Sequence, residues 1–398
     1  MRALLAAKRD GVAKRYLYYE QKVKISAPVI PVPPRFQNIN IRLGWCAKAV
    51  DTLADRLTFR EFTNDILDMN AIYEANNGAV LRHAAMLSAL ISACSFLYIS
   101  RDESGYPRIQ AIDGGRATGV ADPITGLLRE GYAVLEKDQV TGETLLEAYF
   151  TAEKTEFYPR NGAPYSVKNP AAYPLLVPVV YRPDERQPFG RPRITRACMD
   201  IMDEAMQTLR LMRICSEFYS FPQKYVLGMD PEADELDKWQ ATMTSMLRID
   251  KDQDGDKPTA GTFAQASMAP YAEVLNTDAR LFAGETGLTP EDLGFVSDNP
   301  ASAEAIKAAH DSLNLTARAA QASFGVGFRN AGYLAACVRD ETAYDIRAAY
   351  GTEAVWEPVF PPDMSALVLA GDGAIKLNQA VPGFMTQDNL SVLTGIRS

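Results

Sequence analysis

The sequence predicts an α+β protein that folds as two or three compact units. Three observations support this fold class. Segments in both halves of the chain repeat apolar residues every three or four positions, which is typical of amphipathic helices. The stretch from residue 96 to residue 181 instead alternates apolar and polar residues between turn sequences, which is typical of strands. A length of 398 residues with 47% hydrophobic and 23% charged residues is ordinary for a chain that buries a sizeable core.

The first hundred residues predict four helices that lead into a strand. In the second helix, Val50, Leu53 and Leu57 share one face. The first has a basic rim and an aromatic end, and a proline-rich connector at 27–35 follows it. The predicted helices cover residues 2–22, 43–57, 64–73 and 79–93, and the sequence FLYIS follows as a strand.

The next eighty residues predict a β-rich unit. Period-two alternation or β-branched residues recur between turns such as Asp113-Gly114-Gly115. The expected strands cover residues 106–112, 132–136, 144–150, 155–158 and 175–181.

Two further amphipathic helices are predicted at 194–220 and 268–285. In the first, acidic residues come early and basic residues late, which suits the helix dipole, and Phe221-Pro222 ends it. In the second, the polar face is expected to carry Glu273, Asp278 and Arg280, and Gly287 is a left-handed cap candidate. The apolar stripes consist of Ile194, Cys198, Ile201, Ala205, Leu209 and Met212 in the first helix, and Tyr271, Val274, Leu275, Ala279 and Phe282 in the second.

A long helix is predicted after an irregular loop. Asn299-Pro300 offers an N-cap followed by a proline at the first helical position. A helix from there to Val338 would extend roughly 58 Å at about 1.5 Å per residue. Its three glycines, Gly325, Gly327 and Gly332, each cost roughly 1 kcal/mol relative to alanine. They predict either a bend or break near Gly325 or the close packing of another backbone against them.

Composition excludes several classes of protein. No window approaches the roughly 20 apolar residues of a membrane helix, and no secretory signal is evident. The net charge of −9 disfavours tight DNA binding through a basic face. Five scattered cysteines and two histidines form no disulfide framework or zinc pattern, and no phosphate loop or dinucleotide fingerprint is present. We therefore expect no cofactor, no catalytic residue and no membrane partner.

One acidic segment keeps an alternative open. Asp250-Lys251-Asp252-Gln253-Asp254-Gly255 matches the opening of a calcium-binding loop. The match fails further on, because Gly261 stands where a bidentate glutamate is needed and Pro258 interrupts the following helix. A solvated acidic turn is the favoured interpretation. The alternative function is a soluble metal-dependent enzyme that uses the Asp250–Asp254 cluster.

Three segments carry a resemblance to a known family. They read RLGWCAKAVDTLADRLTFREF, FGRPRITRACMDIMDEAMQTLRLM and FAGETGLTPEDLGFVSDNPASAEAIKAAH. These sequences resemble the portal proteins of tailed double-stranded DNA bacteriophages, in the siphophage branch. The order of helix, ordered loop and very long helix also resembles that family. The resemblance implies a portal fold with a helical stem, a long tunnel-lining helix, a mixed α/β wing and a small clip.

The resemblance also implies a domain plan. Residues 1–182 would form the N-terminal arm and wing, 183–222 the first stem helix, 223–266 the clip, 267–287 the second stem helix, 288–302 the tunnel loop, and 303–398 the long helix and C-terminal wing. Family members usually continue into a helical crown. Because the sequence ends at Ser398, the crown is absent or has been removed, and its functions are not carried over.

The implied function is a ring, dodecameric in the family, at one capsid vertex of the virion, assembled in the host cytoplasm. Genome DNA would pass through it during packaging and ejection without sequence recognition. The implied partners are the terminase large subunit, head–tail adaptors, and the major capsid and scaffold proteins. The residues expected to pack the stem are Ile201, Leu209, Tyr271, Leu275 and Phe282.

The tunnel loop is expected to repel DNA rather than grip it. From Leu281 through Ile306 there is no lysine or arginine, whereas five acidic residues are present. Carboxylates within about a Debye length, roughly 8 Å, of the phosphates would keep the duplex centred. The competing explanation is that these acids lie at the starts of helices, where the helix dipole favours negative charge. The expected DNA-facing residues are Glu291, Asp292, Ser297, Asp298 and Asn299.

Overall fold

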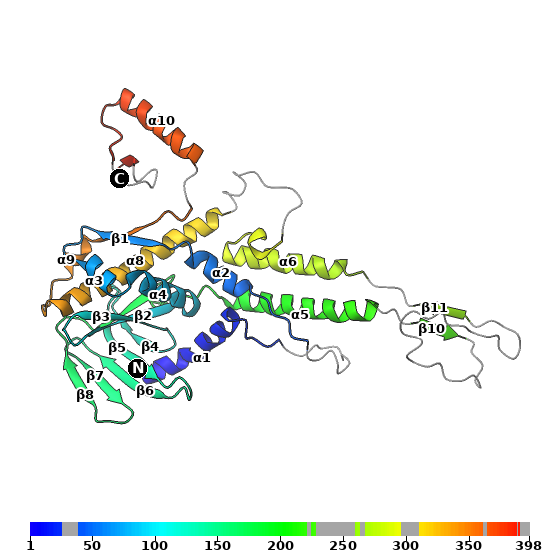
Figure 1. Ribbon diagram of the computed structural model, residues 1–398, viewed down its shortest axis with the longest axis horizontal. Coiled ribbons are helices and arrows are strands. Elements are labelled where there is room, and N and C mark those ends of the chain that lie inside the picture. The colour runs from blue at the N-terminus through cyan, green and yellow to red at the C-terminus, as the bar shows by residue number, and fades with distance from the viewer. Residues whose placement is uncertain are drawn as a thin grey trace, which may run out of the picture.

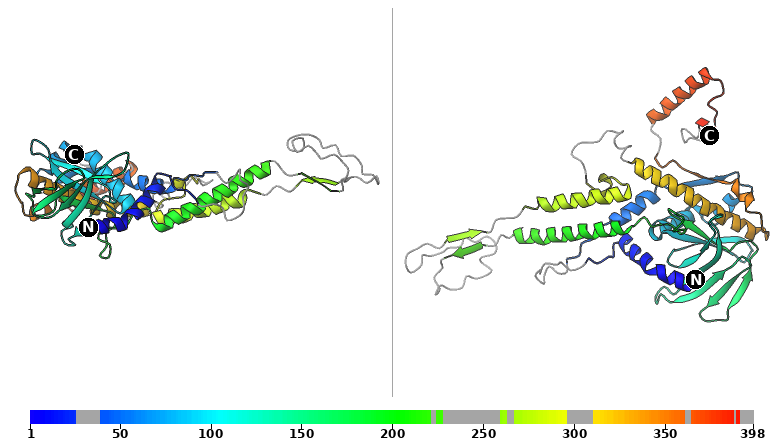
Figure 2. Two further views of the ribbon diagram at one scale, coloured as in Figure 1. Left: turned by 90° about the horizontal axis from the view of Figure 1, so that it is seen from below. Right: turned by 180° about the vertical axis from the view of Figure 1, so that it is seen from behind.

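The computed structural model of the chain describes residues 1–25, 39–220, 224–227, 259–262, 267–295, 310–360, 364–387 and 389–390. A mixed body of helices and sheets contains most of these residues, and a pair of long helices projects from it (Figure 1). The view from behind shows the same projection, with a two-stranded ribbon at its far end (Figure 2). The fold is therefore α+β, as the sequence predicts, and its shape is elongated.

The helices and strands follow the predicted order. The helices are α1 (Arg2–Tyr19), α2 (Trp45–Ala54), α3 (Met69–Ala75), α4 (Gly78–Ser92), α5 (Arg196–Ser220), α6 (Ala269–Thr286), the 3₁₀ turn η2 (Glu291–Leu293), α8 (Asp311–Arg339), α9 (Arg347–Tyr350) and α10 (Met364–Ala380). The strands are β1 (Phe59–Thr63), β2 (Cys94–Arg101), β3 (Pro107–Ile112), β4 (Ala117–Ala121), β5 (Leu128–Lys137), β6 (Thr144–Phe150), β7 (Lys154–Pro159), β8 (Tyr165–Lys168), β9 (Leu176–Val180), β10 (Lys224–Leu227), β11 (Thr259–Thr262) and β12 (Glu353–Trp356).

Within the described residues, the strands pair into four antiparallel sheets. A three-stranded sheet has the order β3-β2-β9, and a five-stranded meander has the order β4-β5-β6-β7-β8. In the first sheet, Phe96 on the central strand lies opposite Ile112 on one side and Pro178 on the other. Two-stranded ribbons join β1 to β12 in the body and β10 to β11 at the far end of the projection.

The long helix α8 crosses the body and packs against the three-stranded sheet, β12 and α3. Phe324 and Phe328 are fully buried, and Phe328 also accepts a 2.8 Å hydrogen bond at its carbonyl from the Tyr73 hydroxyl. The predicted break near Gly325 is wrong, because α8 runs without interruption from Asp311 to Arg339. The part of the predicted helix before residue 310 lies outside the described residues.

The glycines of α8 allow close packing instead. A Cβ atom on Gly327 would lie 3.1 Å from the Pro178 carbonyl oxygen and 3.2 Å from Val179 Cα. On Gly332 it would lie 2.9 Å from the Met69 sulfur atom. The alternative prediction, close packing of a backbone against these glycines, is therefore correct at Gly327, where β9 approaches the helix, whereas Gly332 meets a side chain.

The start of the third helix differs from its prediction. α3 begins at Met69 rather than near residue 64, because the Asp65 carboxylate accepts hydrogen bonds of 2.8 Å from the backbone N–H groups of both Met69 and Asn70. Residues 59–63, which precede it, form the unpredicted strand β1. This strand is defined by its partner β12, almost 300 positions later in the chain.

The sequence also missed strands β4, β8 and β11. β4 reads ATGVA and lacks alternation, and its Gly119 lies opposite Gly131 of β5. β8 is an edge strand whose four residues are all exposed. β4 buries its first three residues in succession and β8 buries none, so neither strand shows the alternating burial of a half-buried strand.

Candidate functional site

Helices α5 and α6 lie side by side and antiparallel, and they form the projection (Figures 1 and 2). The Cys215 sulfur and the Tyr271 hydroxyl are 3.1 Å apart across the pair. Of the residues expected to pack the stem, Phe282 is fully buried, and Ile201, Leu209, Tyr271 and Leu275 are half-buried. Their role in stem packing stays a prediction.

The buried stripe of α5 is displaced from the predicted one. Cys198 and Ala205 are buried as expected, but the further buried positions are Met199, Met202, Met206, Arg210 and Ile214. α5 carries apolar residues over more than half of its circumference, so spacing alone does not select the packed face.

Asp278 was expected on the polar face of α6, and this expectation is wrong. Its side chain is only 7% exposed, and its Oδ2 atom has no hydrogen-bond partner among the described residues. Burial, with a smaller contribution from Glu204 of α5, raises the pKa of the Asp278 carboxyl group. Glu273 and Arg280 are exposed as expected.

The chain reverses direction in a tight turn after α6. Gly287 has a φ of +68°, the left-handed value that suits glycine, as predicted. The backbone N–H of Leu288 donates to the Ala283 carbonyl at 3.1 Å. The Asp292 carboxylate then accepts from the N–H and the hydroxyl of Thr289, both at 3.0 Å. The first part of the predicted tunnel loop is therefore an ordered turn.

The two acids of this turn differ in their surroundings. Glu291 is exposed. The Asp292 side chain is 18% exposed, and its Oδ2 atom is occupied by Thr289 and lies 3.9 Å from His310 Nδ1. These contacts favour a capping role for Asp292, the competing explanation for acids in this segment. Ser297, Asp298 and Asn299 lie outside the described residues.

Two residues that sequence reasoning missed join the turn to the body. Trp45, the first residue of α2, has its ring centroid 5.5 Å from that of Phe282 and 6.2 Å from that of Phe295. Arg193, 5% exposed, donates to the carbonyls of Ala49 and Thr286. The sequence RPRITR indicated only a basic, turn-rich segment, so no signal singled out Arg193 within it.

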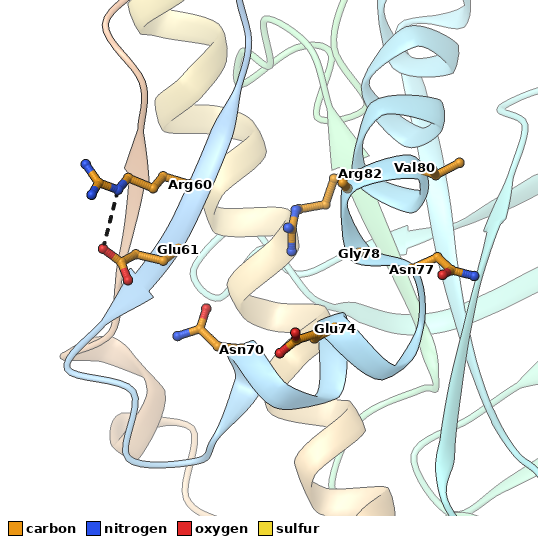
Figure 3. A pocket seen from close by; sticks show the side chains of 9 residues that line it. Arg60, Glu61, Asn70, Glu74, Asn77, Gly78, Val80 and Arg82 are labelled. Atoms are coloured by element: carbon orange, nitrogen blue, oxygen red, sulfur yellow. Dashed lines mark ion pairs between the residues drawn. The ribbon is translucent and has the colours of Figure 1, made fainter.

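The body also contains a hollow of about 520 Å³ beside β1 and the start of α4 (Figure 3). Charges of both signs line it, including Arg60, whose Nε lies 3.8 Å from Glu61. The Arg82 guanidinium lies 4.2 Å from the Phe59 ring centroid. This mixture of charges defines no particular ligand.

The alternative metal site has no counterpart in the described part of the chain. Asp250 and Asp254 lie outside the described residues, and within them no three or more His, Cys, Asp or Glu side chains group so that they could hold a metal ion. All five cysteines are free, and four of them are buried as small apolar side chains. None of the described helices is long and apolar enough to cross a bilayer.

Comparisons with known proteins agree with the fold. The family model described as "Phage portal protein, SPP1 Gp6-like" matches residues 5–379. The portal protein of Mycobacterium phage D29 is 26% identical over 346 residues, which cover 80% of this chain and 69% of that protein. The portal protein of Mycobacterium phage L5 is 25% identical over 328 residues, covering 76% and 66%. The chain thus spans about two thirds of the length of these relatives.

Solved structures of a gene transfer agent particle are also similar. A chain of its native virion has a TM-score of 0.47 and 13% identity, and a chain of its native neck, computed with C12 symmetry, has 0.47 and 14%. Each match covers 89% of this chain and 90% of the other.

An α+β body with a projecting pair of antiparallel helices, and a turn at their inner end, is the architecture of a viral portal subunit. Since the family model spans nearly the whole sequence, the chain belongs to the SPP1 Gp6-like family of phage portal proteins. This is a family of structural proteins.

Proposed function

We propose that this portal protein assembles into a ring, dodecameric as the family resemblance implies, whose stems surround double-stranded DNA at the portal vertex of a phage capsid. The observation that carries the proposal is the exposed apolar surface of the projecting helix pair. Val274 and Leu281 of α6 are 48% and 55% exposed, and they lie beside the face that α6 buries. A neighbouring subunit would cover them, since a closed ring brings one side of each stem against the other side of the next.

We assign the regions as the sequence suggests. Residues 1–182 and the part after 303 form the wing with the long helix, 183–222 and 267–287 the stem, 223–266 the clip and 288–302 the tunnel loop. The β10–β11 ribbon, at the far end of the stem, lies within the clip. We propose this end as the docking surface for the terminase large subunit and later for the head–tail adaptors, and the wing as the surface for capsid and scaffold proteins.

DNA would slide through the ring rather than bind to it. The described residues from 281 to 295 contain no lysine or arginine, while Glu285 and Glu291 are exposed. Each phosphate neutralised by a cation would add affinity that the moving duplex has to break. A net charge of −9 keeps such contacts few.

A threading experiment tests this proposal. Rings are assembled in the presence of linear duplex DNA, the DNA ends are ligated into circles, and the complexes are washed with high salt. A ring that encloses DNA stays on the circles through the wash and leaves after a single restriction cut. Equal loss from circles and linear DNA in high salt would show surface binding and contradict the proposal.

The acidic collar has its own test. Asp298→Lys should leave ring assembly intact but slow the release of rings from linear DNA, most strongly at low salt, where screening is weakest. Glu103→Lys makes the same charge change at an exposed turn of the wing and serves as the control. Equal release rates for Asp298→Lys and wild type across a salt series would leave the loop as a spacer.

A further inference from the structure

We propose that Trp45 and Arg193 are positioning residues that clamp the inner end of stem helix α6 and the turn 287–295 onto the wing. The inference rests on the proposed function, because that function gives residues 288–302 their role as the tunnel loop. It adds that the first eight residues of this loop are a fixed base, and that the wing sets the position from which the rest of the loop continues.

Arg193 joins three helices through hydrogen bonds to the backbone. Its Nε donates to the Ala49 carbonyl of α2 at 2.6 Å, and its Nη2 donates to the Thr286 carbonyl at 2.8 Å. Its own backbone N–H donates to the Leu90 carbonyl of α4 at 2.8 Å. Thr286 is the last residue of α6, where carbonyls lack helical partners and a positive charge is favoured by the helix dipole.

Among the described residues, the Arg193 side chain donates to two carbonyl oxygens, and the ion pairs within those residues do not include it. A buried guanidinium without a carboxylate is costly, and an apolar residue of similar size would pack this position at lower cost. Its fork of donors is what a backbone clamp requires, because one side chain reaches two carbonyls in a fixed geometry.

Trp45 contacts residues before the turn and at its end. Its ring contacts Phe282, which lies one turn before the end of α6, and Phe295, which lies beyond η2. Trp45 is 5% exposed and Phe282 is fully buried. Since Trp45 begins α2, this contact attaches the turn to the same wing helix that supplies the Ala49 carbonyl.

The turn is compact enough to be held as a unit. The N–H of Gly294 donates to the Glu291 carbonyl and that of Phe295 to the Pro290 carbonyl, each at 3.0 Å. Within the turn, the N–H and hydroxyl of Thr289 donate to the Asp292 carboxylate, and the N–H of Asp292 donates to the Thr289 hydroxyl oxygen. Fixing Phe282, Thr286 and Phe295 therefore orients the whole turn.

Amide hydrogen exchange on the full-length protein tests the clamp. We expect Arg193→Lys, which keeps the charge but loses the fork, to speed the exchange of the Leu288, Gly294 and Phe295 amides by on the order of tenfold, the effect of losing one hydrogen bond to a charged group. Trp45→Leu should do the same, because leucine keeps apolar bulk but does not reach both rings. Amides of α8 should keep their wild-type rates in both variants.

Phe150→Leu is the matched control, since Phe150 is fully buried on β6 of the five-stranded sheet, whereas the junction is formed by α2, α6 and η2. It should lower the melting temperature without changing exchange in the turn. If Arg193→Lys and Trp45→Leu lower the melting temperature but leave the turn amides at wild-type rates, both residues are ordinary core residues and the clamp is refuted. The exchange measurement needs no DNA, so its failure is distinct from failure of the threading experiment.

Discussion

At the residue scale, hydroxyl groups of tyrosine fasten the N-terminal helix to the rest of the protein. Tyr16, Tyr18 and Tyr19 donate to aspartates at 2.7, 2.6 and 2.9 Å. The acceptors are Asp113 after β3, Asp203 of stem helix α5, and Asp51 of α2. Burial and the Asp51 carboxylate raise the pKa of Tyr19 to about 12. The helix thus connects the wing to the stem through neutral donors and charged acceptors.

In the projecting helix pair, Asp278 of α6 carries a buried carboxyl group. Burial raises the pKa of its carboxyl group in the folded state, so between the ordinary and the raised pKa the folded chain binds more protons than the unfolded chain. This contribution to stability is therefore largest at acidic pH and is lost as the pH rises through the raised value. We expect Asp278→Asn to increase the free energy of unfolding at pH 7 by about 1 kcal/mol.

Urea unfolding at several pH values checks this expectation. The gain from Asp278→Asn should shrink toward zero as the pH falls below the ordinary aspartate range. Glu273→Asn, an exposed change on the same helix, should produce no such pH dependence. A gain from Asp278→Asn that is the same at pH 4 and pH 7 would contradict the assignment of the cost to a buried charge.

At the element scale, the close approach of α8 to β9 makes Gly327 a position where added volume is costly. A methyl group at Gly327 meets the backbone of Pro178 and Val179, which cannot rotate away. We expect Gly327→Ala to destabilise the fold by about 1–3 kcal/mol, the usual cost of overpacking. Gly373→Ala in α10, where a Cβ would meet nothing within 4 Å, should stabilise by up to about 1 kcal/mol. Thermal unfolding of the two variants measures both effects, and equal effects would refute the close packing.

The exposed face of α6 gives a prediction about assembly. Phe282 is a poor probe of ring contacts, because it is fully buried against Trp45 and its replacement by Asp would disrupt the junction. We expect Leu281→Asp to leave the circular dichroism spectrum unchanged and to block ring formation in size-exclusion chromatography. Ile124→Asp, at a wing turn where the side chain is 88% exposed, should assemble normally. Normal rings from Leu281→Asp would mean that this face of α6 is not a subunit contact.

Elements with a strong local signal were predictable from the sequence. Strand β6 matches its predicted residues, and α4 and α6 match within about two. Elements defined by distant partners were not predictable, as β1 shows, since its partner β12 is remote in the sequence. The same distinction applies to the site: Gly287 was identified from its place after a helix, whereas Arg193 and Trp45 act through contacts that no local pattern encodes.

At the scale of the whole molecule, several large apolar side chains of the described residues are exposed. Helix α10 stands apart from the body in Figures 1 and 2, and its Val368, Leu369 and Ile375 are 62%, 71% and 59% exposed. A helix of this length is marginal in water on its own, so most of its stability must come from packing. Together with Leu281 and Val274 of the stem, this surface is what a ring of subunits would bury.

Electron microscopy of the purified full-length protein is the most direct test of the ring. We expect annular particles with a central channel lined by the projecting helix pairs, and with the wings at the outer rim. A population of compact single subunits at the same protein concentration, with no annular particles, would contradict it.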